Sequence, residues 1–224
     1  MPVKRLLKYA LRIIVALIIV PVWLWYVALL MFLGKDRAFR EAYEVLAYWP
    51  GTVGVLARSI LCSWVFPHAG KDIYIGPGTL FSHADNIIGN NVYIGPNCSV
   101  GRVRIGNDVL VASHVSIING GRQHGYEDVG RSIREQTGTW PVIHIGTGAW
   151  IGERAVVMAD VGEHSIVGAG SVVTKAVPPC CIVAGNPARL IRTRKQQDTS
   201  VADTGNRRST ACPTSQNEVS HDRN

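Results

Sequence analysis

One histidine in this chain stands where proton transfer could take place. His124 lies in the segment INGGRQHG, between Gly121 and Gly125 and two residues after Arg122. An imidazole held in a polar loop can take the proton of a hydroxyl group at neutral pH, as a general base does in group transfer. The sequence therefore predicts His124 as the catalytic base of a transfer to a hydroxyl.

The other histidines have plainer explanations. His114 falls at a corner of the repeat described next, and His144 and His164 stand beside regularly spaced aliphatic residues, which favours structural roles. No serine or cysteine has a base placed to activate it, so a covalent intermediate is not expected. We expect no metal site either, because no close pair of histidines accompanies His114 and His124.

The elements that must position His124 come from a six-residue repeat. Twelve aliphatic residues keep this spacing, often with glycine directly after them: Ile88, Ile94, Val100, Ile105, Val111, Ile117, Ile145, Ile151, Val157, Val161, Val167 and Val173. A period of six fits neither an α-helix nor an alternating strand. It fits stacked coils that turn a corner every six residues and point one aliphatic side chain inward from each face. The glycines would serve a positive φ or a close approach of backbones. An antiparallel β-sandwich with valine-rich strands is the alternative.

The repeat is interrupted once. Between Ile117 and Ile145 the spacing lapses into a polar, glycine-rich segment that includes His124. Long irregular segments inside a regular fold usually carry function, so we expect residues 118–142 to be extruded as a loop. Ahead of the regular repeat, Ile75 and Phe81 should face inward on a first, less regular coil.

A membrane anchor is expected ahead of the repeat, in residues 1–34. Residues 13–33 carry no charge, and a helix of this length would reach about 30 Å, the thickness of the hydrocarbon layer. Apolar residues surround its whole circumference, which is untypical of a soluble core helix. A signal peptide is the other alternative, but no cleavage site follows the segment.

The charges leave the orientation of this anchor open. Basic residues ahead of the span predict a cytoplasmic N-terminus, and a single crossing would then put the repeat outside. Lys35 and Arg37, after the span, argue against translocation. Either Pro21 breaks the helix and makes it re-entrant, or residues 45–66 cross back. We expect residues 35–69 to form an amphipathic interfacial helical linker, with both ends of the anchor cytoplasmic.

Composition agrees with a membrane-bound protein of a reducing compartment. The net charge is +7, and residues 1–70 hold eight Lys and Arg against three Asp and Glu. This charge indicates a membrane surface rather than nucleic acid, because no aromatic-interleaved basic patch is present. Five cysteines without CxxC spacing favour buried or inert thiols. Residues 193–224 are polar and are predicted to be a disordered tail.

Three segments resemble the hexapeptide-repeat acyltransferases. SIINGGRQH (116–124) looks like the loop of the catalytic histidine in sugar O-acetyltransferases of the maltose and galactoside acetyltransferase type, and in their relatives from exopolysaccharide and lipopolysaccharide clusters. The segment WIGERAVVMADVGEHSIVGAGSVVTKAVPP (150–179) is similar to the final coils of the family, and AGNPARLIR (184–192) to its C-terminal signature. The resemblance implies a mainly β fold, a parallel left-handed β-helix, over residues 70–192.

The resemblance also implies the donor and the assembly. The donor would be acetyl-CoA, bound in a groove between neighbouring subunits of a homotrimer. The places that match the donor site of the family are Ala169, Thr174, Lys175, Arg189 and Arg192, and the candidates for acceptor contacts are Asn119 and Arg122. Small residues would let pantetheine lie against backbone amides, and basic residues would suit the phosphates.

The predicted function is O-acetyl transfer to a sugar hydroxyl in bacterial surface or exopolysaccharide biosynthesis, on the cytoplasmic side of the inner membrane. The acceptor would be a saccharide or a lipid-linked saccharide, and no nucleic acid is expected. Two alternatives stay open: an N-acetyltransferase of a nucleotide-linked amino sugar, and a non-catalytic membrane scaffold. A γ-type carbonic anhydrase would share the fold, but the histidine spacing that it needs for zinc is missing.

Overall fold

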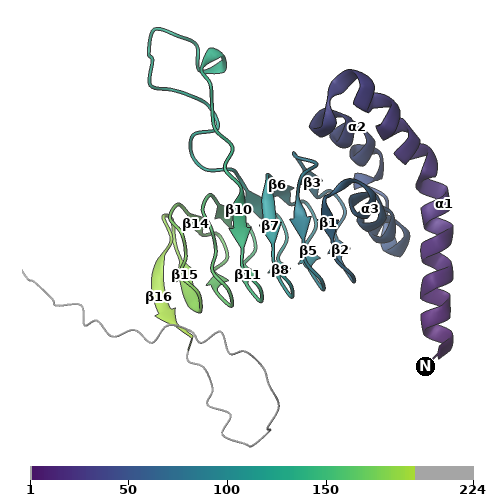
Figure 1. Cartoon of the computed structure of the whole chain (residues 1–224). Coiled ribbons are helices and arrows are strands. Elements are labelled where there is room, and N and C mark those ends of the chain that lie inside the picture. Colours follow the sequence, from purple (N-terminus) through teal and green to yellow (C-terminus); the bar gives the residue numbers. More distant parts are fainter. Residues whose placement is uncertain (1, 195–224) are drawn as a thin grey trace, which may run out of the picture.

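The computed structural model of the chain describes residues 2–194. Helices come first, and a stack of short strands follows them, as Figure 1 shows. The helices are α1 (Pro2–Leu33), α2 (Lys35–Ala47) and α3 (Gly51–Val65). The tail predicted to be disordered, residues 193–224, lies outside the described residues except for its first two.

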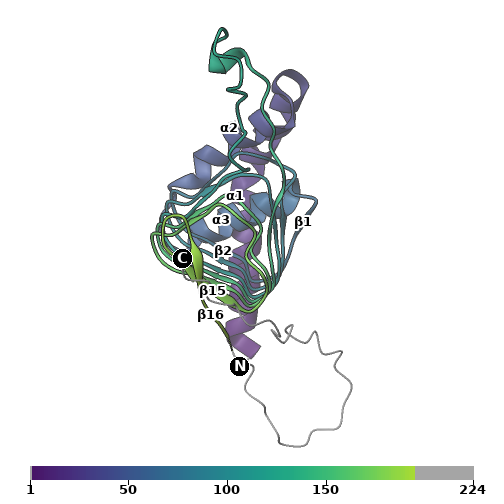
Figure 2. The ribbon, with the colours of Figure 1, turned by 90° about the vertical axis from the view of Figure 1, so that its left-hand side faces the viewer.

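The strands make three faces of a prism. In the stack all neighbouring strands pair in parallel, and only the last pair, β15 with β16, is antiparallel. One face has the order β1-β4-β7-β10, the second β16-β15-β13-β11-β8-β5-β2, and the third β14-β12-β9-β6-β3. Figure 2 shows the coils stacked behind one another, with one long loop leaving them. This is a parallel β-helix, and the β-sandwich alternative is wrong.

The strands are short because each coil turns a corner every few residues. Their bounds are β1 (His68–Ala69), β2 (Tyr74–Ile75), β3 (Leu80–Phe81), β4 (Ile87–Ile88), β5 (Tyr93–Ile94), β6 (Ser99–Val100), β7 (Val103–Ile105), β8 (Leu110–Val111), β9 (Ser116–Ile117), β10 (Ile143–Ile145), β11 (Trp150–Ile151), β12 (Val156–Val157), β13 (Ile166–Val167), β14 (Val172–Val173), β15 (Cys181–Ala184) and β16 (Arg189–Thr193). Single bridges from Ile145 to Val161 and from Val161 to Val177 continue the first face.

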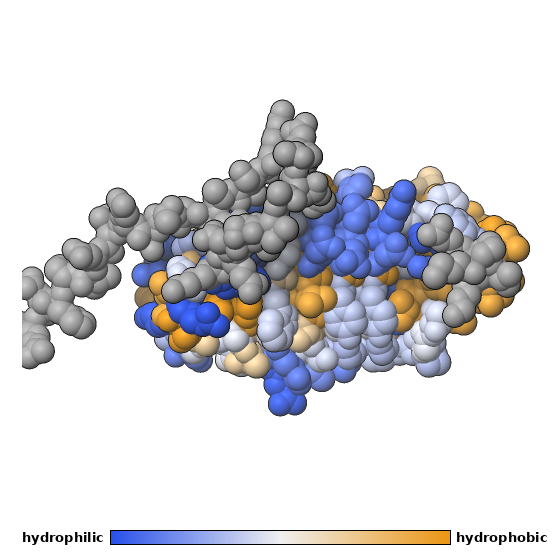
Figure 3. Space-filling model, turned by 90° about the horizontal axis from the view of Figure 1, so that it is seen from below, coloured by the Kyte–Doolittle hydropathy of each residue, from blue (hydrophilic) through white to orange (hydrophobic). Residues whose placement is uncertain are grey.

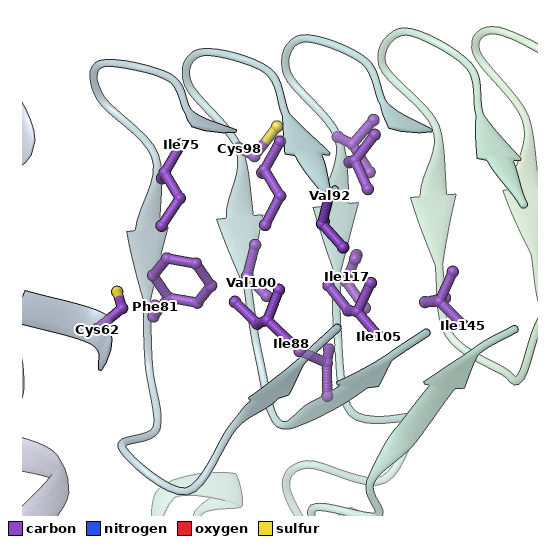
Figure 4. Packing of buried hydrophobic residues seen from close by; sticks show 14 of the residues in the cluster. Cys62, Ile75, Phe81, Ile88, Val92, Cys98, Val100, Ile105, Ile117 and Ile145 are labelled. Atoms are coloured by element: carbon purple, nitrogen blue, oxygen red, sulfur yellow. The ribbon is translucent and has the colours of Figure 1, made fainter. Parts of the chain in front are cut away.

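The core is a ladder of the residues that keep the six-residue spacing. All twelve predicted inward positions are buried, with 0% to 3% of their surface exposed. Ile75 and Phe81 are buried as well, which confirms the inward register of the first coil. Figure 4 shows some of these side chains between the faces, among them Ile88, Ile105 and Ile145, which are register partners in successive coils. Burial of such a ladder is the main favourable term in the folding of stacked repeats.

The glycines that follow the inward residues serve the close approach of neighbouring coils. A Cβ on Gly76 would lie 2.4 Å from the backbone nitrogen of Pro96, and one on Gly89 would lie 2.6 Å from the carbonyl carbon of Gly106. The positive φ angles fall instead on other corner residues, among them His114 at 57°. Of the two explanations that the sequence left open for these glycines, close approach is therefore the right one.

Helix α3 covers the open end of the first coil, as an exposed edge requires. Its Arg58 is fully buried and donates hydrogen bonds to the carbonyl oxygens of Ile75 (3.0 Å), Leu46 (3.0 Å) and Trp49 (2.9 Å). One guanidinium thus joins the end of α2 to strand β2. Most of α3 is buried in this layer, so it caps the prism, and an interfacial role of the linker stays a prediction.

Helix α1 is continuous through Pro21, so the alternative in which this proline breaks the helix is wrong. The segment Leu6–Leu33 is long and apolar enough to cross a membrane, and among the described residues it is the one helix of that kind. Residues 45–66 do not form a second span, because α3 is short and lies against the prism.

The cysteines Cys62, Cys98 and Cys181 are free and buried, as expected of inert thiols. Burial raises the pKa of the Cys62 thiol well above its ordinary value, which keeps the thiol protonated.

Candidate active site

A long loop leaves the prism where the repeat lapses. It begins after β9 at residue 118, returns at residue 142 and carries a short 3₁₀ helix, η1 (Ile133–Glu135). In Figures 1 and 2 it projects from the prism on the side where α2 lies. The expectation of an extruded segment over residues 118–142 is therefore confirmed.

Asn119 closes the foot of this loop. Its side chain is buried, with 1% of its surface exposed. The Oδ1 atom accepts a hydrogen bond from the backbone N–H of Arg102 (2.9 Å), and Nδ2 donates to the carbonyls of Arg102 (2.9 Å) and Pro141 (2.8 Å). The amide thus joins the outgoing chain, the returning chain and the coil beneath them. Its predicted contact with an acceptor stays a prediction beside this structural role.

A second contact between the outgoing and returning chains of the loop lies further from the prism, beside His124. The backbone N–H of Thr139 donates to the carbonyl of Arg122 (2.7 Å), and Gly138 packs so closely that a Cβ there would overlap the carbonyl of Gln123. The Arg122 side chain itself is exposed and lies 3.9 Å from a carboxylate oxygen of Glu127. The backbone on both sides of His124 is therefore held, while the Arg122 guanidinium stays free to meet a ligand.

The His124 side chain is exposed and has one ring contact among the described residues. It meets Trp140 edge to face, with 6.4 Å between ring centroids and 79° between the planes. An edge contact of this kind orients an imidazole while both ring nitrogens stay accessible. Such a group can accept a proton from an incoming hydroxyl.

A cavity of about 420 Å³ opens at the foot of the loop, beside this histidine. His124 is not itself in the lining, but its chain neighbour Gln123 and its ring partner Trp140 are. The cavity brings together acidic, basic, hydroxyl, imidazole and aromatic groups from three parts of the chain: Asp36 and Arg40 of α2, Ser82 and His83 of the coils, and Gln123 and Trp140 of the loop.

The walls of this cavity are fixed by hydrogen bonds. Asp36 accepts one at Oδ1 from the backbone N–H of Ala84 (2.8 Å), which ties α2 to the coil. Asp85, next to the lining, accepts another at Oδ2 from Nε of Arg102 (2.8 Å), and the backbone N–H of Arg102 donates to the side chain of Asn119 in the lining. The hydrogen bonds of Arg102 keep the pKa of the Asp85 carboxyl below its ordinary value, so the pair stays charged at neutral pH.

Sequence reasoning did not assign α2 or His83 to the site. Asp36 and Arg40 are far from the loop in sequence, and no spacing relates them to it. His83 was one histidine among seven, and its contact with the Ser82 hydroxyl (2.8 Å from Oγ to Nδ1) becomes visible only in the structure. Their part in the site depends on how the linker folds back against the coils.

The predicted donor residues surround the last coils. Ala169 precedes β14, and Thr174 and Lys175 follow it directly, all on the surface. Arg189 and Arg192 are exposed on β16, which pairs with β15. The turn between these strands is held to β14 by a hydrogen bond from Ala188 N–H to the carbonyl of Val172 (2.8 Å).

Two of the predicted donor residues, Thr174 and Lys175, follow a strand of the sheet from which the loop leaves, whereas Arg189 and Arg192 lie on β16 of another sheet. Strands β9, β12 and β14 are neighbours in one sheet, and the loop leaves after β9 while Thr174 and Lys175 leave after β14. At the spacing of neighbouring strands, two steps amount to about 10 Å. The chain segments that carry the loop and Thr174 and Lys175 therefore leave the same sheet two strands apart.

Known proteins of similar sequence and fold are acetyltransferases. No protein-family model matches the chain. It is 34% identical over 148 residues to galactoside O-acetyltransferase of Escherichia coli (strain K12), an alignment that covers 63% of this chain and 70% of that protein. A hexapeptide-repeat-containing acetyltransferase from Vibrio cholerae has a similar structure, with 25% identity, a TM-score of 0.61, and 72% of this chain and 94% of that one covered.

A further solved structure is a galactoside acetyltransferase in complex with coenzyme A. It is 26% identical, with a TM-score of 0.54, and the match covers 77% of this chain and 92% of the other.

Proposed function

The chain belongs to the hexapeptide-repeat acetyltransferases, the family of galactoside O-acetyltransferase, and from this we propose that it transfers an acetyl group from acetyl-CoA to a hydroxyl of a saccharide. It is an acyltransferase on a left-handed parallel β-helix, as these relatives are. The observation that carries the proposal is the exposed His124, whose neighbour Gln123 and ring partner Trp140 line a polar cavity.

The reaction follows from this arrangement. A sugar hydroxyl in the cavity gives its proton to His124 while its oxygen attacks the carbonyl carbon of the acetyl thioester. The carbon–sulfur bond then breaks, the acetyl group stays on the sugar oxygen as an ester, and the imidazolium returns the proton to the sulfur of coenzyme A. Backbone N–H groups would stabilise the oxyanion that forms in between.

The cavity suits a saccharide. Trp140 offers an apolar surface, and the carboxylate, guanidinium, hydroxyl and imidazole groups around it can exchange hydrogen bonds with several hydroxyls at once. We propose Arg122 and Asn119 at the rim of this acceptor site. The acceptor is a free or lipid-linked saccharide of bacterial surface or exopolysaccharide biosynthesis, reached from the cytoplasmic side of the inner membrane. The apolar α1 supports the membrane association.

The function is tested by the product. Membranes that contain the protein, supplied with acetyl-CoA and saccharide fractions, should yield glycans heavier by one acetyl group in place of one hydrogen, and membranes without it should not. Mild alkali should remove this group, because esters hydrolyse under conditions that leave amides intact. A group resistant to alkali would indicate the amino-sugar alternative. No transfer to any fraction would indicate the scaffold.

The donor site is proposed at Ala169, Thr174, Lys175, Arg189 and Arg192, in a groove that a second subunit of a homotrimer completes. Replacing both Lys175 and Arg189 with alanine should weaken coenzyme A binding by roughly tenfold or more, because each cation can form charge-assisted hydrogen bonds with phosphate. Calorimetry should show a much smaller loss for a pantetheine fragment that lacks the nucleotide.

A matched variant tests whether charge alone explains the effect. The substitutions Arg131→Ala and Arg134→Ala remove the same charge from the loop and should leave coenzyme A binding close to that of the parent. Equal losses for coenzyme A and for pantetheine in the Lys175 and Arg189 variant would reject the phosphate-binding role.

A further inference from the structure

Helix α1 lies across the N-terminal end of the prism and is joined to it at both ends. Near its start, Lys8 Nζ donates to Asp72 Oδ1 of the first coil at 2.6 Å. At its other end α2 follows after one residue and is tied to the coils through Asp36. In Figures 1 and 2 the helix runs across the stack rather than along it. The exposed Lys8–Asp72 ion pair contributes little to the free energy of folding. Together with the contact of Asp36, it shows that both ends of α1 lie beside the same folded domain.

The inner face of α1 is packed against the helical layer. Val15, Ile19 and Tyr26 are buried there, and the rings of Trp23 and Trp64 meet edge to face with centroids 6.2 Å apart. These contacts run along most of the apolar segment. If α1 left the folded domain to enter a bilayer alone, the apolar residues of α3 that it covers would be exposed to water.

The outer face of α1 is apolar along its length and has no partner among the described residues. Its large exposed side chains include Leu17, Leu24, Trp25, Met31 and Phe32, the last two more than 80% exposed. In Figure 3 hydrophobic residues gather at the end of the molecule where α1 lies, whereas hydrophilic residues cover much of the prism. An exposed apolar surface of this extent marks an interaction site.

Basic residues lie at the edges of this face. A cavity of about 450 Å³ between α1 and the first coil is lined by Lys8, Arg12 and Lys71, with Asp72 as the one acidic residue of its lining. Lys35 and Arg37 stand directly after the other end of the helix. Cations that surround an apolar face suit the phosphates of anionic lipid headgroups, while the face itself suits acyl chains.

A crossing of the membrane conflicts with these contacts. If α1 crossed a bilayer in its packed position, α2, which packs against it, would enter the hydrocarbon with Asp36, Arg37 and Glu41, all of which are exposed. Placing ionised side chains there is costly. Basic residues at both ends also fit a helix whose two ends lie on one side of the membrane.

We propose that α1 lies in the plane of the membrane, within one leaflet, with its outer face among the acyl chains and with Lys8, Arg12 and Lys71 on anionic headgroups. The inference rests on the membrane association in the proposed function and adds its geometry. The prism then stands on the membrane by its N-terminal end. Because α2 follows the anchor and also lines the cavity, the acceptor site faces a membrane-borne saccharide.

The sidedness of the two ends of α1 tests the proposal in the full chain. Single cysteines are introduced as Leu6→Cys and Lys35→Cys, and labelling by a membrane-impermeant maleimide is compared with that of the parent. In inverted inner-membrane vesicles both should be labelled, and in spheroplasts neither. Labelling from opposite sides would show that α1 crosses the membrane and would overturn the in-plane geometry.

Two further outcomes separate this inference from the function on which it rests. If washing with salt or carbonate releases the protein from membranes, membrane association itself fails, and a dimer in solution that buries α1 would identify a second copy as the partner of the outer face. Both results overturn the proposal. Neither changes the expected acetyl transfer, which is measured separately.

The headgroup contact is tested by competition between vesicles. Given vesicles of phosphatidylcholine alone and vesicles that also contain phosphatidylglycerol, the parent should prefer the anionic ones. The Lys8→Ala/Lys71→Ala variant should lose roughly fivefold of this preference for each residue removed. The Arg131→Ala/Arg134→Ala variant should retain it. An equal loss in both variants would reject a specific role for the cavity beside α1.

Discussion

Replacement of His124 by asparagine should lower turnover by a factor on the order of 10² to 10⁴, the usual contribution of a positioned general base. In the proposed mechanism the exposed imidazole beside the cavity takes the proton from the acceptor hydroxyl, and an amide cannot replace it. Coenzyme A affinity should change little, because the proposed donor site is at the last coils. Initial rates of thiol release with saturating acceptor, together with calorimetry of coenzyme A, measure the two effects.

Two other histidines serve as comparisons. His114 sits at a corner with a φ of 57°, a conformation that asparagine also tolerates, so His114→Asn should keep its fold and most of its activity. His83 lines the cavity, and His83→Asn should raise the KM for the acceptor more than it lowers turnover. If His83→Asn abolishes turnover while His124→Asn retains it, the base is His83 and the assignment to His124 is wrong.

The features that the sequence predicted are those that a short-range pattern controls. A six-residue period needs no knowledge of distant contacts, because each coil packs on the coil before it in the same way. Val111, for example, pairs with Ile94, 17 residues earlier, and with Ile151, 40 residues later. Each of the three residues has the same place in its own coil. The lapse of the period located the loop for the same reason.

The features that the sequence did not predict depend on how the helices fold back on the prism. Arg58 lies in an apolar segment, and only the structure shows that it binds the carbonyl groups of α2 and β2. Asp36 and Arg40 were assigned to a linker, yet they line the cavity beside His124. A break at Pro21 was one of two alternatives that the sequence left open, and only the structure shows that α1 continues through this proline.

Replacement of Val111 by aspartate should prevent stable folding. Val111 is fully buried in β8, between Ile94 and Ile151 of the neighbouring coils. A carboxylate there has no partner, and the lost apolar contact adds to the cost of burying a charge or of protonating it. The penalty should exceed about 4 kcal/mol, a large part of the 5–15 kcal/mol that stabilises a typical domain. The coil lies in the middle of the stack, so the coils on both sides lose a neighbour.

The adjacent residue provides the matched control for this prediction. Leu110 precedes Val111 in the same strand and points outward, with half of its surface exposed. The substitution Leu110→Asp therefore introduces the same charge on the same backbone and should change the free energy of unfolding by only about 1 kcal/mol or less. Thermal melting followed by circular dichroism separates the two variants. The inward register of the whole repeat would be wrong if Val111→Asp melted like the parent, or if Leu110→Asp melted at a lower temperature than Val111→Asp. Side chains alternate between the two faces of a strand, so the orientation of one position fixes the orientation of its neighbours.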